Sequence, residues 1–299
     1  MFRNRTTLMF LAICGVIIYH LCLRGIHIGR LNIGYMGVDV FMLLSGYGIA
    51  KSLSRNTLRQ FYHNRATRIL PLWTIMILSV FCINMSLRGG NCDITAFWSN
   101  ITSLSFYFEP DLLPEWYLAT LLMFYALSPL LKTLLEKGGW TVLILISMAI
   151  IIKEEIWGSD RWQYANAIAR FPLYLLGMTC AIKDKEDLPY SVTLPLFFLS
   201  IVFFFQNQHY LFSACAVLLL VQIANKLIDK WDSFKNRLSN WIGTHTLELY
   251  VANTISATIA HYIFHPGMHI VTKISIDTAL TVGISLLLWN INSRVQKQK

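Results

Sequence analysis

Residues 8–53, LMFLAICGVIIYHLCLRGIHIGRLNIGYMGVDVFMLLSGYGIAKSL, decide the fold class of this chain. They form two apolar runs joined by a short Gly-rich turn, and each run contains one ionisable residue. His20 lies three residues before the first run ends, and Asp39 lies four residues after the second begins. At about 1.5 Å of rise per residue, both lie about 5–6 Å inside the same membrane face. A helical hairpin is therefore predicted, with an imidazole and a carboxylate at matching depth.

Each of these two residues has a structural explanation as well as a functional one. A histidine in an apolar helix can satisfy an interhelical hydrogen bond, and an aspartate can hold two helices together. Titratable groups inside a bilayer are costly, however, and a functional site is the default hypothesis for them. Their shared depth on adjacent helices favours the functional interpretation of His20 and Asp39.

The rest of the chain has the composition of a membrane protein. Of its 299 residues, 55% are hydrophobic and only 14% are charged, and the mean hydropathy is +0.51. Repeated apolar runs predict an all-α, polytopic membrane protein with about ten transmembrane helices. The predicted spans are 7–23, 34–52, 69–87, 115–134, 140–152, 165–182, 190–206, 210–228, 246–264 and 274–291. We expect a single membrane-embedded domain over residues 1–299, whose first apolar run is a retained helix rather than a cleaved signal peptide.

Positive charge is divided unevenly between the two sides of the predicted membrane. Eighteen of the 25 Lys and Arg residues fall on the side that holds the N-terminus, and seven fall on the other. The positive-inside rule therefore predicts that both termini are cytoplasmic. This places His20 and Asp39 near the outer face, and it attributes the formal charge of +9 to topology rather than to nucleic-acid binding.

The most basic stretch is residues 51–73, KSLSRNTLRQFYHNRATRILPLW. Arg65 and Arg68 are three residues apart and so share one helix face, just before the third apolar run. Paired guanidinium groups suit a phosphate-bearing ligand, to which they can bind through bidentate hydrogen bonds. By charge alone, an anchor that touches anionic lipid headgroups explains them better.

Small residues and thiols in the apolar runs have packing explanations. The second run contains Gly34, Gly37, Gly46 and Gly48, and Gly46 shares a helix face with Asp39. Small residues let another helix approach closely, so helix packing accounts for these glycines. The six cysteines show no CxxC spacing, so neither a disulfide framework nor a metal site is expected.

Several segments together carry a resemblance to a known family. GYMGVDVFMLLSGYGIAKSL, followed by HNRATRILPLW, resembles the motifs of the acyltransferase family 3 membrane proteins. The shared features are a titratable His at the outer end of the first span, a GVDxF…SG second span and an RxxR entry to the third. LPEWYLATLLMFYALSPLL (113–131) and IGTHTLELYVAN (242–253) resemble later segments of the family, so the similarity runs across nearly the whole chain.

This resemblance implies an integral-membrane O-acyltransferase of the bacterial inner membrane. It implies acetyl-CoA as the acyl donor, held from the cytoplasm by Arg65 and Arg68, and a cell-envelope polysaccharide or glycolipid as the acceptor. His20 would be the general base on the acceptor hydroxyl, and Asp39 would orient its ring and stabilise the imidazolium. A transient acetyl-imidazole is an alternative route.

One position departs from the family pattern. The family usually has Arg or Lys eleven residues before the His, where this chain has Met9. Arg5 is the candidate substitute in the donor site, because it lies about 60° around the helix from His20 and one turn lower. Glu115 and Trp116 are candidates for binding the acceptor sugar. A solvated helix start explains Glu115 as well, and an interfacial aromatic belt explains Trp116.

Two other classes compete with the enzyme. A transporter or flippase for a sugar or lipid-linked substrate often shows inverted repeats and paired broken helices near the midplane, and the sequence shows neither. In a non-catalytic scaffold, His20 and Asp39 would serve only in packing. The acceptor glycan, the acyl group, the route of transfer and the oligomeric state stay open at this point.

Overall fold

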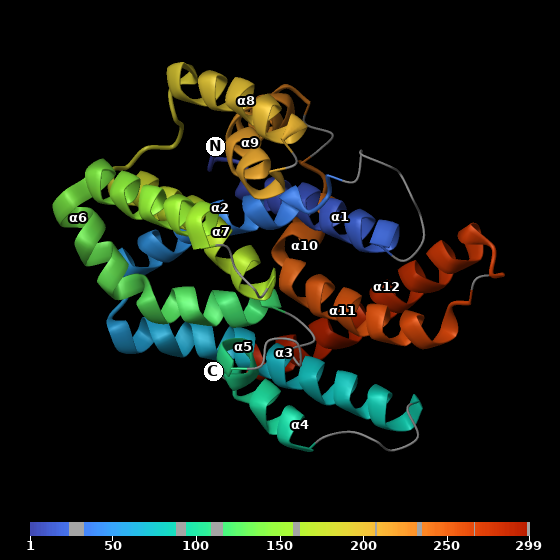
Figure 1. Cartoon of the computed structure of the whole chain (residues 1–299). Coiled ribbons are helices and arrows are strands. Elements are labelled where there is room, and N and C mark those ends of the chain that lie inside the picture. The colour runs from blue at the N-terminus through green and yellow to red at the C-terminus, as the bar shows by residue number, and fades with distance from the viewer. Residues whose placement is uncertain are drawn as a thin grey trace. The chain divides into compact units, whose positions relative to one another are not determined.

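The computed structural model describes residues 1–23, 33–87, 94–108, 116–157, 162–206, 208–231, 235–265 and 267–297. Within these ranges every regular element is a helix and none is a strand, which confirms the all-α prediction (Figure 1). The helices are α1 (Arg5–Leu23), α2 (Met36–Arg55), α3 (Leu58–Leu87), α4 (Ile94–Ile101), α5 (Leu104–Phe108), α6 (Trp116–Trp157), α7 (Trp162–Ile182), α8 (Tyr190–Phe205), α9 (His209–Lys230), α10 (Arg237–Thr244), α11 (Thr246–Ile263) and α12 (Ile270–Lys297).

The helices divide into two compact units, each assembled from segments that are distant in sequence. The first unit comprises Met1–Val16, Gly34–Phe61 and Leu122–Thr244, and the second comprises Ile17–Ile33, Tyr62–Leu121 and His245–Lys299. In the first unit, α2 packs on α7 and α8 packs on α9. In the second unit, α11 packs on α12. Because α1, α3 and α6 each contribute to both units, the chain passes between them repeatedly.

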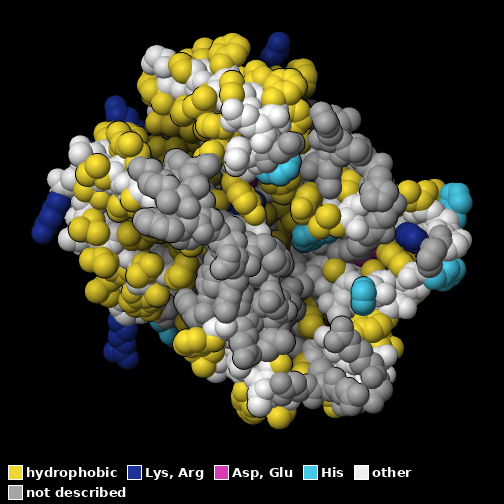
Figure 2. Space-filling view, viewed as in Figure 1, with side chains coloured by type: hydrophobic (Ala, Val, Ile, Leu, Met, Phe, Trp, Pro, Cys, Tyr) yellow, Lys and Arg dark blue, Asp and Glu magenta, His cyan; other side chains and the backbone are white. Residues whose placement is uncertain are grey.

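Five of the described helices are long and apolar enough to cross a membrane. They are Arg5–Leu23, Leu58–Leu87, Trp116–Ile150, His209–Lys230 and Ile270–Arg294. Figure 2 shows hydrophobic side chains gathered on the surface of α8 and α6. Among these exposed side chains are Phe198, Phe205 and Leu145. An apolar surface of this kind is suited to lipid, and the chain is an integral membrane protein.

Each of the ten predicted spans falls on a described helix, but two of them share one. α6 carries both the 115–134 and the 140–152 spans, and it is interrupted at Gly139, which has a non-helical φ of 54° and ψ of −131°. Glycine adopts a positive φ without steric penalty, so the chain changes direction there. Asn166–Ile182 and Tyr190–Phe205 are shorter apolar helices. The number of ten membrane crossings stays a prediction.

The antiparallel pairing predicted for α1 and α2 is present in the first unit, whereas their connecting turn lies outside the described residues and the matching depth of His20 and Asp39 stays a prediction. A Cβ atom added at Gly37 would lie 2.3 Å from the carbonyl oxygen of Ala12, so the two backbones touch there. Nearer the other end of the pair, the Arg5 guanidinium lies against Gly48. Early positions of α1 therefore face late positions of α2, which makes the two helices antiparallel.

A close crossing in the first unit joins α2 to α7. A Cβ atom at Gly46 would lie 2.0 Å from the carbonyl oxygen of Tyr174, and one at Gly177 would lie 2.1 Å from that of Leu43. Both glycines therefore let backbone touch backbone, as small residues do between membrane helices. This confirms that close helix approach accounts for Gly46.

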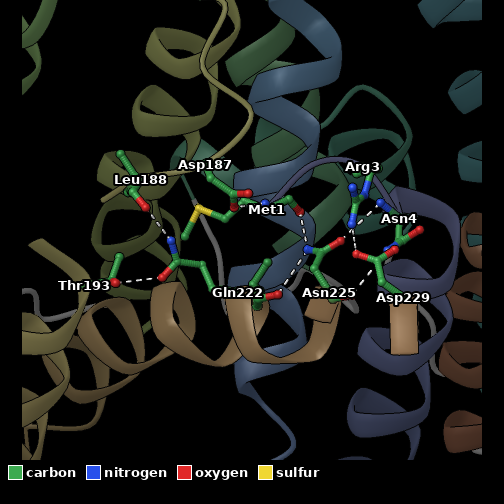
Figure 3. Close-up of polar contacts among 10 residues, drawn as sticks. Met1, Arg3, Asn4, Asp187, Leu188, Thr193, Gln222, Asn225 and Asp229 are labelled. Atoms are coloured by element: carbon green, nitrogen blue, oxygen red, sulfur yellow. Dashed lines mark hydrogen bonds and ion pairs between the residues drawn. The ribbon is translucent and has the colours of Figure 1, made fainter. Parts of the chain in front are cut away.

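A polar network fixes the first residues of the chain to α9 (Figure 3). The Nδ2 group of Asn225 donates to the carbonyl oxygen of Met1 at 2.7 Å, and its Oδ1 accepts from the backbone N–H of Asn4 at 3.2 Å. One turn further along α9, Asp229 accepts from the side chains of Arg3 and Asn4. One polar face of α9 is thereby satisfied inside the protein.

We expect Gly177→Ala to destabilise the protein by about 1–3 kcal/mol, because the added methyl group would collide with the backbone of α2 and force the helices apart. Thermal unfolding of the purified protein in detergent measures the change.

Gly283→Ala is the matched control. It also lies in a helix, α12, but no atom lies within 4 Å of the added Cβ. Here the substitution is expected to be neutral or to stabilise by about 0.5–1 kcal/mol, the difference in helix propensity. Equal effects of the two substitutions would contradict the close crossing.

Candidate active site

Asp39 lies in the first turn of α2, and its carboxylate is enclosed by the first unit. The hydroxyl of Ser213 on α9 donates a hydrogen bond to Oδ2, and Nε of Arg170 on α7 lies 3.5 Å from Oδ1. The exposed fractions are 2% for Asp39, 3% for Arg170 and 1% for Ser213. A buried carboxylate needs such partners, because an uncompensated charge between apolar helices is strongly unfavourable.

Arg170 is itself held in a fixed position. Its Nη1 donates to the backbone oxygen of Asn166 at 3.0 Å and to the side-chain oxygen of Asn166 at 2.9 Å. The ring of Tyr210 lies 5.6 Å from the guanidinium carbon, within the range of a cation–π contact. Arg170 can therefore act as a fixed counter-charge that orients the Asp39 carboxylate.

The α2–α7 crossing explains why these two residues meet. Asp39 lies seven residues before Gly46, and Arg170 lies seven residues before Gly177. Because the ion pair precedes the glycines by the same number of residues on both helices, α2 and α7 run parallel. The alignment set where the glycines cross is therefore maintained two helical turns away, at the ion pair. Sequence reasoning missed Arg170, although a lone charge inside the apolar run 165–182 was a usable signal.

His20 belongs to the second unit and is half-buried. Its Nδ1 lies 2.5 Å from Oδ1 of Asn253, a buried residue on α11. An amide oxygen can only accept, so Nδ1 must carry the proton and donate it. In a neutral ring this leaves the lone pair on Nε2, the atom able to take a proton from a substrate. Asn253 lies in the segment 242–253 that resembles the family, but no role was predicted for it.

Aromatic side chains of α6 and α11 contact one another in the second unit. The ring of Tyr250, three residues before Asn253 on α11, lies 4.8 Å from the ring of Tyr117. Trp116, the first residue of α6, is half-buried and contacts Tyr117 edge to face. Trp116 is thus the chain neighbour of a residue that contacts α11, the helix that carries Asn253, and its predicted role in acceptor binding stays a prediction. Glu115 lies outside the described residues.

The three predicted donor-binding arginines lie on two helices. Arg65 and Arg68 are on α3 in the second unit, where Arg65 is half-buried and Arg68 is exposed. Arg5 is in the first turn of α1 in the first unit, with its guanidinium against Gly48. Met9, at the position where the family has a basic residue, packs against the apolar core of the first unit. A single donor site made of all three arginines stays a prediction.

The structure thus pairs each candidate catalytic residue with partners from its own unit. It joins Asp39 to Arg170 and Ser213, and it joins His20 to Asn253. The pairing of His20 with Asp39 stays a prediction. In the part of the chain that the structure describes, no group of three or more His, Cys, Asp or Glu side chains could hold a metal ion.

Comparison with known proteins adds the family context. The acyltransferase 3 family, described as "Acyltransferase domain", matches residues 8–290. Proteins of Staphylococcus aureus strains COL, MSSA476 and MRSA252, each named "Putative O-acetyltransferase", are 25% identical over 326 aligned positions. The alignment covers 91% of this chain and 53% of each relative, so the chain spans about half the length of the curated relatives it matches. No solved structure matches the chain.

Removal of Arg170 alone should be much more damaging than removal of the whole ion pair. Arg170→Leu leaves the Asp39 carboxylate buried without its counter-charge, which is expected to reduce stability by about 3–5 kcal/mol. The double variant Asp39→Asn/Arg170→Leu should lose less than the sum of the two single changes. A double-mutant cycle on thermal unfolding measures this coupling, and additive losses would argue against the pair.

Proposed function

Because the chain belongs to the acyltransferase 3 family, we propose that it is a membrane O-acyltransferase that moves an acetyl group from cytoplasmic acetyl-CoA to a hydroxyl of a cell-envelope polysaccharide or glycolipid. The observation that carries this proposal is the His20–Asn253 pair, because it leaves Nε2 as a general base on a family-matching segment. The O-acetyltransferase name of the relatives supports the choice of a hydroxyl acceptor.

The chemistry assigned to His20 is proton transfer in two steps, coupled to acyl transfer. Nε2 takes the proton of the acceptor hydroxyl while that oxygen attacks the thioester carbonyl. A C–O bond forms, the C–S bond breaks, and the leaving thiolate takes the proton back from the imidazolium. General-base catalysis of this kind contributes about 10²–10⁴ in rate. Attack by Nε2 itself, through an acetyl-imidazole, is the alternative route.

Asp39 is assigned the role of stabilising the imidazolium that forms at His20. Such a carboxylate must stay ionised in an apolar setting, and the contacts of Arg170 and Ser213 support that requirement. Arg170 is then a positioning residue, since it acts on the reaction only through Asp39.

Arg65 and Arg68, with Arg5, are assigned to the phosphate groups of the donor. Guanidinium groups bind phosphate oxygens in a bidentate geometry, and neighbouring positions on α3 allow Arg65 and Arg68 to bind one ligand together. Trp116 and Glu115 are assigned to the acceptor, for which an aromatic face and a carboxylate are suitable sugar contacts.

The direction of α7 supports the ten-span topology. Two membrane helices that run in the same direction are separated by an odd number of crossings. Because α7 runs parallel to α2, an odd number of crossings lies between them, and three crossings, one by α3 and two by α6 on either side of Gly139, fit the ten-span proposal. This count, with the positive-inside rule, supports one membrane domain of the bacterial inner membrane with both termini cytoplasmic.

His20→Ala is expected to reduce the rate of acetyl transfer by a factor of about 10²–10⁴. Asn253→Ala is expected to reduce the rate less and to alter the pH–rate profile, because the tautomer of the His20 ring is no longer fixed. Release of CoA by the reconstituted protein and the O-acetyl content of envelope glycans, measured by NMR, test this. His265→Ala, at an exposed histidine of the same unit, is the control. Wild-type turnover in a correctly inserted His20→Ala protein would refute the assignment.

Arg65→Gln/Arg68→Gln is expected to raise KM for acetyl-CoA by about tenfold or more while kcat changes little, because hydrogen bonds to charged groups are lost in binding. Arg59→Gln removes an exposed cation from the same helix and should leave KM unchanged. Equal responses to both variants would indicate that the arginines only anchor the helix at the membrane surface.

A further inference from the structure

A large, partly open apolar cavity lies within the first unit, and Asp39 is not among its lining residues. It has a volume of about 1030 Å³ and is lined by α7, α8, α9, the α7–α8 loop and the part of α6 that follows Gly139. This is at the upper end of the roughly 300–1,000 Å³ typical of small-molecule sites. Most of its walls are hydrophobic, and they include Leu143, Leu173, Leu176, Leu196 and Leu218.

The cavity borders on the lipid-facing surface. Ile144 and Met148, which line it from α6, are 54% and 53% exposed, and Val192 lines it from α8 and is 44% exposed. In a membrane protein such apolar side chains contact hydrocarbon rather than water. A lipid chain can therefore reach the cavity from the bilayer without passing through water.

One wall of the cavity is nearly as long as one leaflet is deep. Trp140 and Met148, which both line it from α6, are eight residues apart, or about 12 Å along a helix axis. Half of a hydrocarbon core of about 30 Å is about 15 Å, so this wall is long enough to lie along one layer of acyl chains.

Two lysines lie at the end of the cavity beside the α7–α8 loop. Lys185 lines it directly, and Lys183 extends to Gly139, where its Nζ would lie 3.2 Å from an added Cβ. Among the residues that the structure describes, neither ammonium group has an acidic partner. Trp140, next to Gly139, supplies an aromatic ring at the same level, as is common at the headgroup depth.

The acidic residues of the same loop do not cancel these charges. Asp184 is paired with Lys51 at 2.6 Å. Asp187, which also lines the cavity, is paired with the amino group of Met1. Glu186 is exposed and is not among the lining residues. The end of the cavity therefore presents two available cations above an apolar interior.

We propose that this cavity binds a diacyl phospholipid from the leaflet that borders the α7–α8 loop. Lys183 and Lys185 bind the phosphate group, Trp140 lies beside the headgroup, and one acyl chain occupies the apolar interior. The phosphate group of such a lipid matches the two lysines, and its hydrocarbon chain matches the apolar walls. The site shares no residue with the candidate active site, so the proposal does not depend on the acyltransferase reaction.

Native mass spectrometry of the purified full-length chain tests the proposal. The protein in detergent is mixed with equal amounts of phosphatidylglycerol and of diacylglycerol with the same acyl chains. We expect the wild-type protein to retain phosphatidylglycerol in about tenfold or greater excess. Lys183→Gln/Lys185→Gln should abolish that preference, whereas Lys230→Gln, an exposed cation at the end of α9 outside the cavity, should keep it.

A second variant tests the apolar part. Ala214→Phe places a ring inside the cavity and should reduce binding of both lipids with the lysines intact. Equal retention of the two lipids by the wild-type protein would overturn the proposal, as would an unchanged preference in the double lysine variant. Displacement of the bound lipid by palmitoyl-CoA at equal concentration would also overturn it, because the cavity would then hold an acyl donor.

Discussion

The backbone contact between α2 and α7 is the constraint on which the candidate site depends. Gly46 and Gly177 remove all side-chain atoms from this crossing, so carbonyl groups of one helix lie directly against the other. Because the helices run parallel and each glycine lies seven residues after a charged residue, the same register brings Asp39 to Arg170. Any residue with a Cβ at the crossing would change the spacing that this ion pair needs.

Other buried polar side chains of the apolar helices also bind a partner on a neighbouring helix. In the second unit, Asn292 donates to Glu248 at 2.7 Å, and Ser256 donates to Asp277 at 2.7 Å, in each case between α11 and α12. Buried side chains of this kind tie helices together, since lipid offers them no hydrogen bonds. His20 and Asn253 have the same form of contact, but an imidazole differs from these groups in that its second nitrogen can also exchange a proton.

Hydropathy and spacing were sufficient for part of this description. The apolar runs predicted the helices, the glycines predicted close approach, and the cost of burying charge singled out His20 and Asp39 as candidates. The partners could not be predicted, because Arg170 and Ser213 reach Asp39 only through the register of helices more than a hundred residues away in sequence. Asn253 carries no charge, so it gave no comparable signal. The sequence also did not predict that one helix, α6, covers two predicted spans. The pair Gly138–Gly139 does not by itself show whether the chain ends a helix there or only bends it.

The polar face of α9 has a consequence for biogenesis. Asn225 and Asp229 are satisfied by Met1, Arg3 and Asn4, which are translated well before α9, because Asn4 and Asn225 are 221 positions apart. Until α9 has been translated, this early segment has no such partner, and α9 cannot be stable among lipids without hydrogen bonds to its amide and carboxylate groups. Co-translational assembly of the first unit must therefore keep the early segment accessible until α9 has been made.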